Sequence, residues 1–416
     1  MKAIIVNIGD ELLIGQVVNT NASWMADLLA AEGIAVERIV AVADRDEAIR
    51  QELERSMAGA ALVLVTGGLG PTRDDITKAT LCRIFNTSLV FNPEAYAMIE
   101  AFFASRGLRV SELNRMQAEL PQGCLPLPNP QGTAPGMWFE KEGCILVAMP
   151  GVPFEMQGIM EHEVVPRLRE RMDGQLILQR TILTHGMGES FLAQRLAHWE
   201  DTLPGDLGLA YLPSPGQVRL RLTARGTDRS ALQAALDEAV HGLQARISEL
   251  IFGYDRDTME GVVGALLKHR GQTLCTAESC TGGYLAHRIT SVPGSSAWYL
   301  GSIIAYANEV KIKQLNVDPL LISTHGAVSE EVVCAMAQGA RLRLGTDWAL
   351  AVSGIAGPDG GSADKPTGTT WIALDGPHGT LAQRFLFGNR RDRNIHMAAM
   401  SAMNMMRKQL KGSATK

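Results

Sequence analysis

The sequence predicts an α/β protein with two parallel-sheet domains and a small α+β module between them. Strand-length apolar runs alternate with helical periodicity in residues 1–90 and again after residue 270. Residues 170–250 instead combine strands of alternating polar and apolar residues with one amphipathic helix. A chain of 416 residues is also too long for a single domain with one core. Alternating strands and helices of this kind form a mostly parallel sheet with helices on both faces.

Composition excludes several classes of protein. Hydrophobic residues make up 46% and charged residues 20% of the chain, and 39 basic against 44 acidic side chains give a net charge of −5. This balance suits a soluble protein and argues against a nucleic-acid or membrane surface. The longest apolar runs, such as Ala60–Val65, are far shorter than a membrane span. The six cysteines form no Cys-x-x-Cys pair and no zinc pattern, so we expect reduced thiols and a cytoplasmic protein.

The first domain is predicted from apolar runs separated by helical segments. The predicted strands are Lys2–Ile8, Ile34–Val42, Ala60–Val65 and Cys144–Met149. The predicted helices are Asn21–Ala31, a helix capped by Asp44 or Asp46 that closes at Gly59, and a helix from Asp74 or Asp75 to about Phe85. Ligands of such sheets bind at the carboxyl ends of the strands, where the loops after Ile8 and Val65 emerge.

The middle module and the last domain are predicted in the same way. Strands Leu176–Thr184 and Gln217–Arg225 and the helix Ser230–Arg246 make the middle module. The last domain begins with the helix Met259–His269, continues with the strand exits Gln272–Gly283 and Trp348–Gly361, and includes the strands Ala297–Tyr306 and Thr370–Leu374.

The segment Leu274–Gly283 runs from a strand end into a helix that begins near Gly283. Its small hydroxyl residues and glycines allow unpaired backbone amides to face a ligand phosphate, with the helix dipole adding attraction. Alternatively, Ser279 and Thr281 merely cap the helix.

Lys311 has a separate physical argument. Asn308 is a plausible N-cap, which places Lys311 near the third helical position. The positive helix end and burial both lower the pKa of such an amine, and a lysine of this kind can act as a general base for a serine. An exposed surface lysine is the alternative.

Two further segments are candidates for contacts with a substrate. Val352–Gly361 is a second glycine-rich strand exit, which either allows close approach of a substrate to the backbone or is a turn cluster. Gly388–Arg393 opens the last helix, where Arg393 either holds a phosphate with two hydrogen bonds or lies on a solvated face.

The first domain offers polar loops after two strands, Gly9–Leu13 and Thr66–Asp75. Glycines after a strand allow a phosphate near the backbone, and adjacent carboxylates can hold a hard cation there. Asp74 and Asp75 are equally good N-caps, and turn chemistry alone also explains these residues. The segments match neither a Walker loop nor a Gly-x-Gly-x-x-Gly fingerprint.

The last domain resembles the nicotinamide-mononucleotide amidohydrolase (PncC) domain. The motifs that carry the resemblance are Ala277–Gly283, Pro293–Ser296, Tyr306–Lys311, His325–Ser329 and Ser353–Gly361, in the family's order and spacing. The resemblance implies hydrolysis of the nicotinamide amide to a carboxylate and ammonia by a serine hydrolase of Ser–Ser–Lys type that uses no metal or other cofactor.

The same resemblance assigns roles to residues. Ser296 is the expected nucleophile, with Lys311 as base through or beside Ser279. The reverse assignment, Ser279 as nucleophile and Ser296 as relay, stays open, and Cys280 is a third candidate nucleophile. The expected substrate-binding residues are Tyr306, Thr281, Gly282, Gly283, Ser353, Gly354, Gly357 and Arg393.

The first domain, with Gly132–Gly136 and Met149–Met156, looks like the molybdopterin-binding (MoaB/Mog-like) fold, a three-layer αβα domain. The middle segment, with Gly186–Ser190, resembles a KH-like insert. Together the three parts resemble the CinA family, with domains at 1–168, 169–252 and 253–416.

The CinA resemblance implies a second activity, a pyrophosphatase that cleaves ADP-ribose and needs a divalent cation such as Mg or Mn. The cation candidates are Asp10, Glu11, Asp74 and Asp75, and the phosphate-side candidates are Gly67, Gly68, Thr72 and Gly132. We expect a homodimer by analogy.

Two other functions compete with this interpretation. The first is a molybdopterin-related enzyme or carrier, suggested by Thr66–Asp75. The second is a non-catalytic protein linked to competence or DNA damage, for which the KH-like segment would bind nucleic acid. That segment shows no Gly-x-x-Gly loop, and the net charge of −5 argues against a phosphate-backbone partner.

Overall fold

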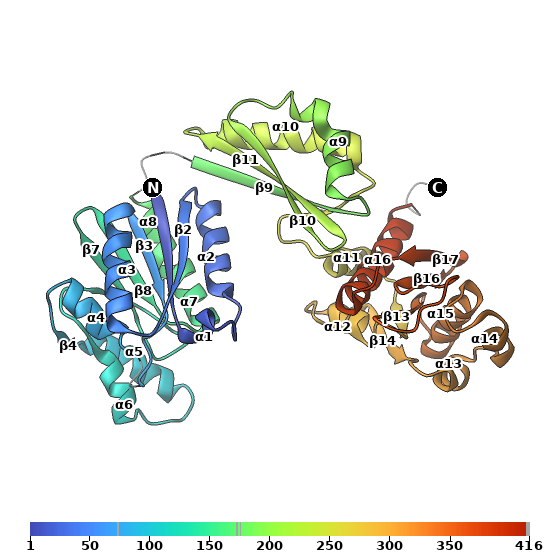
Figure 1. The fold of residues 1–416 in the computed structure, drawn as a ribbon, viewed down its shortest axis with the longest axis horizontal. Coiled ribbons are helices and arrows are strands. Elements are labelled where there is room, and N and C mark those ends of the chain that lie inside the picture. Colours follow the sequence, from blue (N-terminus) through green and yellow to red (C-terminus); the bar gives the residue numbers. More distant parts are fainter. Residues whose placement is uncertain (73–74, 172–173, 175, 413–416) are drawn as a thin grey trace. The chain divides into compact units, whose positions relative to one another are not determined.

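A computed structural model of the chain describes residues 1–72, 75–171, 174 and 176–412 (Figure 1). The chain forms two compact units. The first contains Met1–Leu178 and Ala224–Gln233, and the second contains Gln179–Thr223 and the chain from Ala234 onward. The predicted domain boundaries at residues 168 and 252 stay a prediction.

The first unit is built on a six-stranded sheet in the order β2-β1-β3-β8-β7-β6. Its strands are β1 (Lys2–Ile8), β2 (Ala35–Val42), β3 (Leu62–Thr66), β6 (Leu125–Leu127), β7 (Gly136–Lys141) and β8 (Cys144–Met149). Strand β1 pairs parallel with β2 and β3, and β3 pairs parallel with β8. Strand β7 pairs antiparallel with β8 and β6. A separate antiparallel pair joins β4 (Leu89–Phe91) to β5 (Glu119–Pro121).

Helices cover both faces of this sheet (Figure 1). They are α1 (Asp10–Leu13), α2 (Thr20–Ala31), α3 (Asp46–Gly59), α4 (Thr77–Ile84), α5 (Pro93–Ala104), α6 (Glu112–Arg115), α7 (Pro153–Ile159) and α8 (Val165–Arg169), with a short 3₁₀ turn Met116–Ala118 and a π turn Met160–Val164. Alternate residues of β1 enter different cores: Ile4 and Val6 pack with α3, α4 and α5, whereas Ala3 and Ile5 pack with α2, α7 and α8. The predicted three-layer arrangement of this domain is confirmed.

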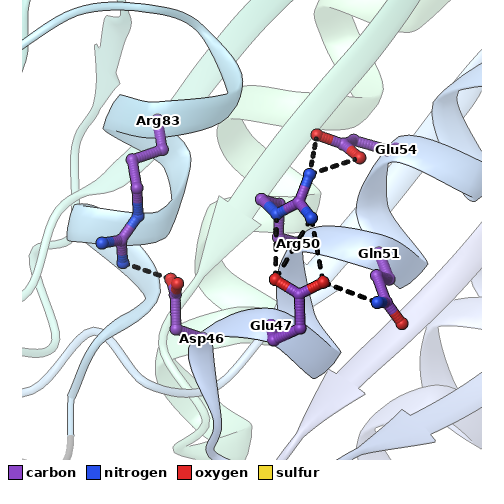
Figure 2. A network of polar contacts seen from close by, with 6 residues as sticks. All are labelled: Asp46, Glu47, Arg50, Gln51, Glu54 and Arg83. Atoms are coloured by element: carbon purple, nitrogen blue, oxygen red, sulfur yellow. Dashed lines mark hydrogen bonds and ion pairs between the residues drawn. The ribbon is translucent and has the colours of Figure 1, made fainter.

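The start of α3 differs from the prediction. Neither predicted aspartate is the cap, because the residue before the helix is Arg45 and it makes no side-chain cap. Asp46 is the first helical residue, and its carboxylate accepts from Thr80 at 2.5 Å and pairs with Arg83 of α4 (Figure 2). Asp75 is also not a cap, since α4 begins at Thr77 after Ile76. Side chains thus link two helices where the sequence suggested local capping.

The middle module is a four-stranded sheet in the order β10-β11-β9-β12 with two helices. Its elements are β9 (Leu176–His185), α9 (Glu189–Glu200), β10 (Leu207–Ser214), β11 (Gln217–Gly226), α10 (Arg229–Ile247) and β12 (Ile251–Tyr254). The predicted α+β character is confirmed. The helix α9 and the strand β10 were not predicted. The residues of β10, LGLAYLPS, contain Gly208 and Pro213 and lack a clear alternation.

The last domain has a five-stranded sheet in the order β14-β13-β15-β16-β17. Its strands are β13 (Leu274–Glu278), β14 (Tyr299–Ile304), β15 (Trp348–Gly354), β16 (Thr369–Gly376) and β17 (Gly379–Leu386). Its helices are α11 (Met259–Arg270), α12 (Tyr284–Thr290), α13 (Asn308–Leu315), α14 (Pro319–His325), α15 (Glu330–Leu344) and α16 (Arg391–Gly412), with a 3₁₀ turn Ser295–Ala297. The first three strands are parallel, and β16 and β17 add an antiparallel edge.

Two apolar cores cover the faces of this sheet. One contains side chains of α13 and α15, and the other contains side chains of α11, α12 and α16. The second core also takes in Leu183 and Phe252 of the middle module. Arg407 of α16 is buried there and donates to the carbonyl oxygens of Ile251 at 2.8 Å and Glu249 at 3.1 Å. The middle module is therefore anchored to α16 by shared packing and buried hydrogen bonds.

None of the helices in the described ranges combines the length and the apolar character that a membrane crossing needs.

Candidate active site

The candidate active site forms where β13 and β15 end side by side. Ser279 directly follows β13, and its backbone amide donates to the carbonyl oxygen of Val352 in β15 at 2.9 Å. Only 8% of Ser279 is exposed. The carboxyl ends of parallel strands share one edge of a sheet, so the two glycine-rich exits predicted from the sequence meet at this serine.

Lys311 of α13 meets Ser279 from the neighbouring element. Its side chain is buried, with 1% exposed, and its Nζ donates to Ser279 Oγ at 3.1 Å and to the carbonyl oxygens of Ala305 at 2.9 Å and Tyr306 at 3.1 Å. Burial lowers the pKa of this amine below its usual 10.5. Lys311 is therefore buried, and the alternative of an exposed surface lysine is wrong. The predicted cap is also wrong, because Asn308 is the first helical residue and Ala307 takes the cap position.

The surroundings of Lys311 suit a neutral amine. A neutral amine has two N–H bonds and one lone pair. In the charged form, the three N–H bonds of Lys311 donate to Ser279 Oγ and to the carbonyl oxygens of Ala305 and Tyr306. When one proton is lost, the two carbonyl oxygens can keep the remaining N–H bonds and the lone pair can accept from the Ser279 hydroxyl. In the described part of the chain, no carboxylate forms an ion pair with this lysine. Ser279 and Lys311 therefore have the geometry of a nucleophile and its base.

Glu278 holds the start of α12. Its buried carboxylate accepts from the backbone amides of Gly283 at 3.0 Å, Leu285 at 3.1 Å and Ala286 at 2.8 Å. The alternative in which Ser279 or Thr281 caps this helix is therefore wrong, because a carboxylate from the preceding strand takes the free amides. These three amides are therefore unavailable to a substrate phosphate. In the sequence, the one signal for the role of Glu278 at this helix start was the glutamate itself within the predicted motif.

The loop after Ser279 leaves hydrogen-bonding groups for a ligand. Within the described ranges, the backbone amide of Thr281 donates no hydrogen bond, and the amide of Cys280 contacts its own thiol. The Thr281 hydroxyl is buried and likewise lacks a partner there. Gly282 has open space where a side chain would extend. Donors next to a nucleophile can stabilise negative charge on a carbonyl oxygen under attack.

Ser296 lies at the other end of the strands. Tyr299, the first residue of β14, pairs with Leu274, the first residue of β13. Ser296 precedes this pair, whereas Ser279 follows the last residue of β13. The five residues of β13 separate the two serines by about 16 Å, at about 3.3 Å per residue. Ser296 is exposed, and no hydrogen bond joins it to Lys311 in the described part of the chain, so the predicted grouping of all three residues stays a prediction.

Arg391 takes the place predicted for Arg393. Arg391 donates to the Tyr306 hydroxyl at 3.3 Å and to the carbonyl oxygen of Gly357 at 3.0 Å. Arg393 instead lines a different cavity beside the middle module. Side chains two positions apart on a helix point in directions that differ by about 200°. The residue at which α16 begins therefore determines which of the two arginines faces the site. Tyr306 is exposed, as a residue that contacts substrate needs to be.

The remaining predicted substrate-side residues lie at the end of β15 and in the loop before α12. Ser353 is buried and donates to the carbonyl oxygen of Ala327 at 2.7 Å. At Gly354, an added Cβ would lie 2.6 Å from Thr370 Oγ1 and 3.0 Å from Cys280 Sγ. A glycine is therefore required for β15 to end against the Ser279 loop. Gly283 and Gly357 have positive φ angles of 96° and 89°, which L side chains rarely adopt.

Cys280 lacks the properties of a nucleophile. Its side chain is buried, and burial raises the pKa of its thiol to about 12. The reactive form of a cysteine is the thiolate, which this environment disfavours.

The first unit contains a cavity of about 480 Å³ at the carboxyl ends of its strands. The predicted residues that line it are Glu11, Gly67, Gly68 and Asp75. Gly67 is required there, because its φ is 107° and an added Cβ would lie 2.2 Å from the carbonyl oxygen of Ile8.

Three other predicted residues of the first unit, Asp10, Thr72 and Gly132, are not in the lining. Asp10 exchanges hydrogen bonds with Asp44, Thr72 donates to Asp75 at 2.9 Å through its amide, and Asp74 is outside the described residues. Gly132 lies behind the lining, where an added Cβ would collide with Glu155 Oε2 at 1.9 Å.

Glu155 is a lining residue that the sequence analysis did not select. It is in the first turn of α7, and Asn129 donates to its carboxylate at 2.6 Å. Burial raises the pKa of this carboxyl. The signal available in the sequence was its place in the Pro153-Phe154-Glu155 helix start directly after β8.

The predicted cation site is incomplete in the described residues. Among them, no three His, Cys, Asp or Glu side chains gather closely enough to hold a metal ion. Glu11 and Asp75 are the two predicted carboxylates that line this cavity, together with Asp44 and Glu155.

Comparison with known proteins covers the whole chain. Residues 256–410 match the family model "CinA C-terminal domain", residues 4–170 match "Probable molybdopterin binding domain" and residues 179–253 match "Damage-inducible protein CinA KH domain". These matches, with the sheets described above, confirm the predicted fold class: a MoaB/Mog-like three-layer domain, a KH-like α+β domain and an α/β C-terminal domain.

Relatives are similar to this chain over nearly its full length. A CinA-like protein of Cytophaga hutchinsonii is 45% identical over 98% of this chain and 97% of its own length. One from Flavobacterium psychrophilum is 43% identical over 99% of both chains. Among solved structures, the competence/damage inducible protein CihA from Agrobacterium tumefaciens is 34% identical, covering 37% of this chain and 93% of its own with a TM-score of 0.36.

Proposed function

The chain belongs to the CinA family, and from this premise and the contact between Ser279 and Lys311 we propose that its C-terminal domain hydrolyses the amide of nicotinamide mononucleotide. The products are the nicotinate nucleotide and ammonia. One observation carries the proposal: a buried lysine without a carboxylate partner in the described ranges directs its nitrogen at a serine hydroxyl 3.1 Å away.

The first half of the reaction forms an ester. Neutral Lys311 takes the proton of the Ser279 hydroxyl, and the serine oxygen attacks the amide carbon of the substrate. The backbone amides of Cys280 and Thr281 are the donors available to the resulting oxyanion. Protonated Lys311 then gives its proton to the departing nitrogen, and ammonia leaves.

The second half of the reaction uses the same base. Lys311 is neutral again once ammonia has left, so it takes a proton from a water molecule that attacks the ester carbon. The carbon–oxygen bond to Ser279 breaks, and the serine recovers its proton from Lys311. The overall balance is one amide and one water in, one carboxylate and one ammonium out. Every proton transfer uses Lys311, so the proposal needs no metal.

The substrate side of the proposal rests on groups around Ser279. Arg391 and Tyr306, which are exposed and hydrogen-bonded to each other, suit the phosphate and ribose of a nucleotide. The expected homodimer stays a prediction.

Release of ammonia from nicotinamide mononucleotide by the purified full-length chain tests this function. We expect release by the unaltered protein and its loss in Lys311→Met, which keeps the volume of the side chain but removes the amine. Lys313→Met is the matched control, because Lys313 is exposed on the same helix. Absence of ammonia release by the unaltered protein from neutral to alkaline pH contradicts the proposal.

We also propose that the N-terminal cavity binds ADP-ribose and cleaves its pyrophosphate. The supporting observation is that Glu11, Gly67, Gly68 and Asp75 line one cavity of about 480 Å³ at the strand ends. In this proposal Glu11 and Asp75 would bind a divalent cation, and the cation would neutralise the charge of the substrate's phosphates.

Release of adenosine monophosphate from ADP-ribose, measured with Mg or Mn and with a chelator, tests this second activity. We expect cation dependence and at least about tenfold slower cleavage in Glu11→Gln. Glu94→Gln, an exposed change on α5, serves as the control. Copurification of a pterin with no cleavage of ADP-ribose favours the molybdopterin-related alternative instead.

A further inference from the structure

A second cavity in the second unit lies away from Ser279. It has a volume of about 410 Å³ and is lined by the middle module and by residues of β17 and α16. Its lining includes His185, Gly188, Phe385, Phe387 and Arg393. The shared core and the buried Arg407 hold these elements together. The volume falls within the range of about 300 to 1,000 Å³ usual for small-molecule sites.

His185 lines this cavity with unused hydrogen-bonding groups. It is 5% exposed, its backbone amide donates to the carbonyl oxygen of Leu250 at 3.0 Å, and both of its ring nitrogens are buried without a partner among the described residues. Burial, with the positive charges of Arg407, Lys408 and His396, lowers its pKa to about 4, so the ring is neutral at pH 7. A neutral imidazole offers one donor and one acceptor, and buried polar groups normally have partners.

Two phenylalanine side chains form the apolar wall. The rings of Phe385 and Phe387 lie 5.4 Å apart with 17° between their planes, and both residues are partly buried. The wall continues into Met397. Flat aromatic surfaces of this kind bind planar heterocycles by stacking.

Another part of the lining suits an anion. Arg393 is exposed, and no ion pair of Arg393 is found among the described residues. The 12-residue helix α9 begins here at Glu189, and its cap residue Gly188 makes no side-chain hydrogen bond to the first amides. Free amides at a helix start and an arginine both attract phosphate. Glu189 is the acid of the lining, and its exposed carboxylate can accept from ribose hydroxyls.

We propose that this cavity binds a nucleoside monophosphate at a site separate from both proposed catalytic sites. The base stacks on Phe385 and Phe387 and forms hydrogen bonds with His185. The phosphate binds Arg393 and the first amides of α9. The proposal goes beyond the amide hydrolysis, because none of its residues touches Ser279 or Lys311.

Calorimetric titration of adenosine monophosphate into the full-length chain tests the site. We expect binding to the unaltered protein and at least about tenfold weaker binding to Arg393→Gln, because a guanidinium–phosphate contact is charge-assisted. Arg390→Gln is the matched control, since Arg390 is exposed near the same helix start and pairs with Asp392, and its affinity should stay within twofold of the unaltered protein.

His185→Phe provides a second variant that keeps the ring but removes both nitrogens, and it should also bind more weakly. Because Arg393 is exposed, Arg393→Gln is expected to unfold at the same temperature as the unaltered protein, which excludes misfolding. Two results overturn the proposal. One is no binding of adenosine monophosphate at millimolar concentration, and the other is equal affinity in Arg393→Gln, which would place the nucleotide elsewhere in the chain.

Discussion

The side-chain nitrogen of Lys311 lies 3.1 Å from the Ser279 hydroxyl, and two backbone carbonyl oxygens accept its remaining hydrogen bonds. This arrangement stabilises the neutral amine as well as the charged one, because each N–H of the neutral form has an acceptor. Burial shifts the balance further toward the neutral form. The pair therefore has a base that is available below the usual titration range of lysine.

The first prediction concerns the pH dependence of amide hydrolysis. The active form is neutral Lys311, so kcat/KM should rise with pH and level off above the pKa of this amine. Since burial lowers that pKa, the plateau begins below 10.5. Steady-state rates of ammonia release across pH 6 to 10 provide the measurement. Lys311→Arg should be inactive throughout, because a guanidinium stays protonated. A rate that falls with rising pH contradicts a lysine base.

The second prediction concerns Cys280. Its buried thiol has a pKa of about 12, so a thiol-alkylating reagent at pH 8 should leave amide hydrolysis unchanged. Cys280→Ala should retain activity within about threefold, because the change removes one sulfur atom from a packed site. Loss of activity on alkylation of the unaltered protein but not of Cys280→Ala would instead assign the nucleophile to this thiol.

The third prediction concerns the carboxylate that holds α12. Glu278→Gln replaces one accepting oxygen with an NH₂ group that opposes a backbone amide. The free energy of unfolding should fall by about 1 to 2 kcal/mol, as for the loss of a helix cap. Urea unfolding measures this change, with Glu309→Gln on the exposed start of α13 as the control. Equal stability of the two variants would show that the three hydrogen bonds contribute nothing measurable.

The fourth prediction concerns His185 and acid stability. Its folded-state pKa of about 4 lies below the ordinary 6.5, so between these values the unfolded chain binds a proton that the folded chain does not. The free energy of unfolding should therefore fall as pH drops from 7 to 5, by on the order of 2 kcal/mol from this residue. Urea unfolding at both pH values measures the effect, and His185→Phe should lack this component. An identical pH response in that variant is the contrary result.

Much of the fold could be predicted because its determinants are local. The predicted strand Lys2–Ile8 has the same bounds as β1 in the structure. The two glycine-rich strand exits meet at Ser279 because the carboxyl ends of parallel strands lie at the same edge of the sheet. Lys311 could be selected from the sequence because a cation in the first turns of a helix opposes the helix dipole, which makes its presence there unusual.

The differences between prediction and structure have one cause, because each depends on where a residue lies relative to the end of a strand or the start of a helix. Ser296 precedes its strand and Ser279 follows its own, and only the second position reaches the edge where ligands bind. Arg391 and Arg393 are equally good candidates until the first residue of α16 is known, because that residue sets the direction of each side chain. Glu278 could not be identified as the partner of three amides, because its role depends on how tightly the loop turns back on β13.

In the proposed reaction Ser279, and not Ser296, is the nucleophile paired with Lys311. The most direct measurement compares ammonia release from nicotinamide mononucleotide by Ser279→Ala and Ser296→Ala in the full-length chain. We predict a loss of at least about a thousandfold in Ser279→Ala, as for other serine nucleophiles, and activity within about threefold of the unaltered protein in Ser296→Ala. A loss confined to Ser296→Ala, with Ser279→Ala still active, would contradict the account.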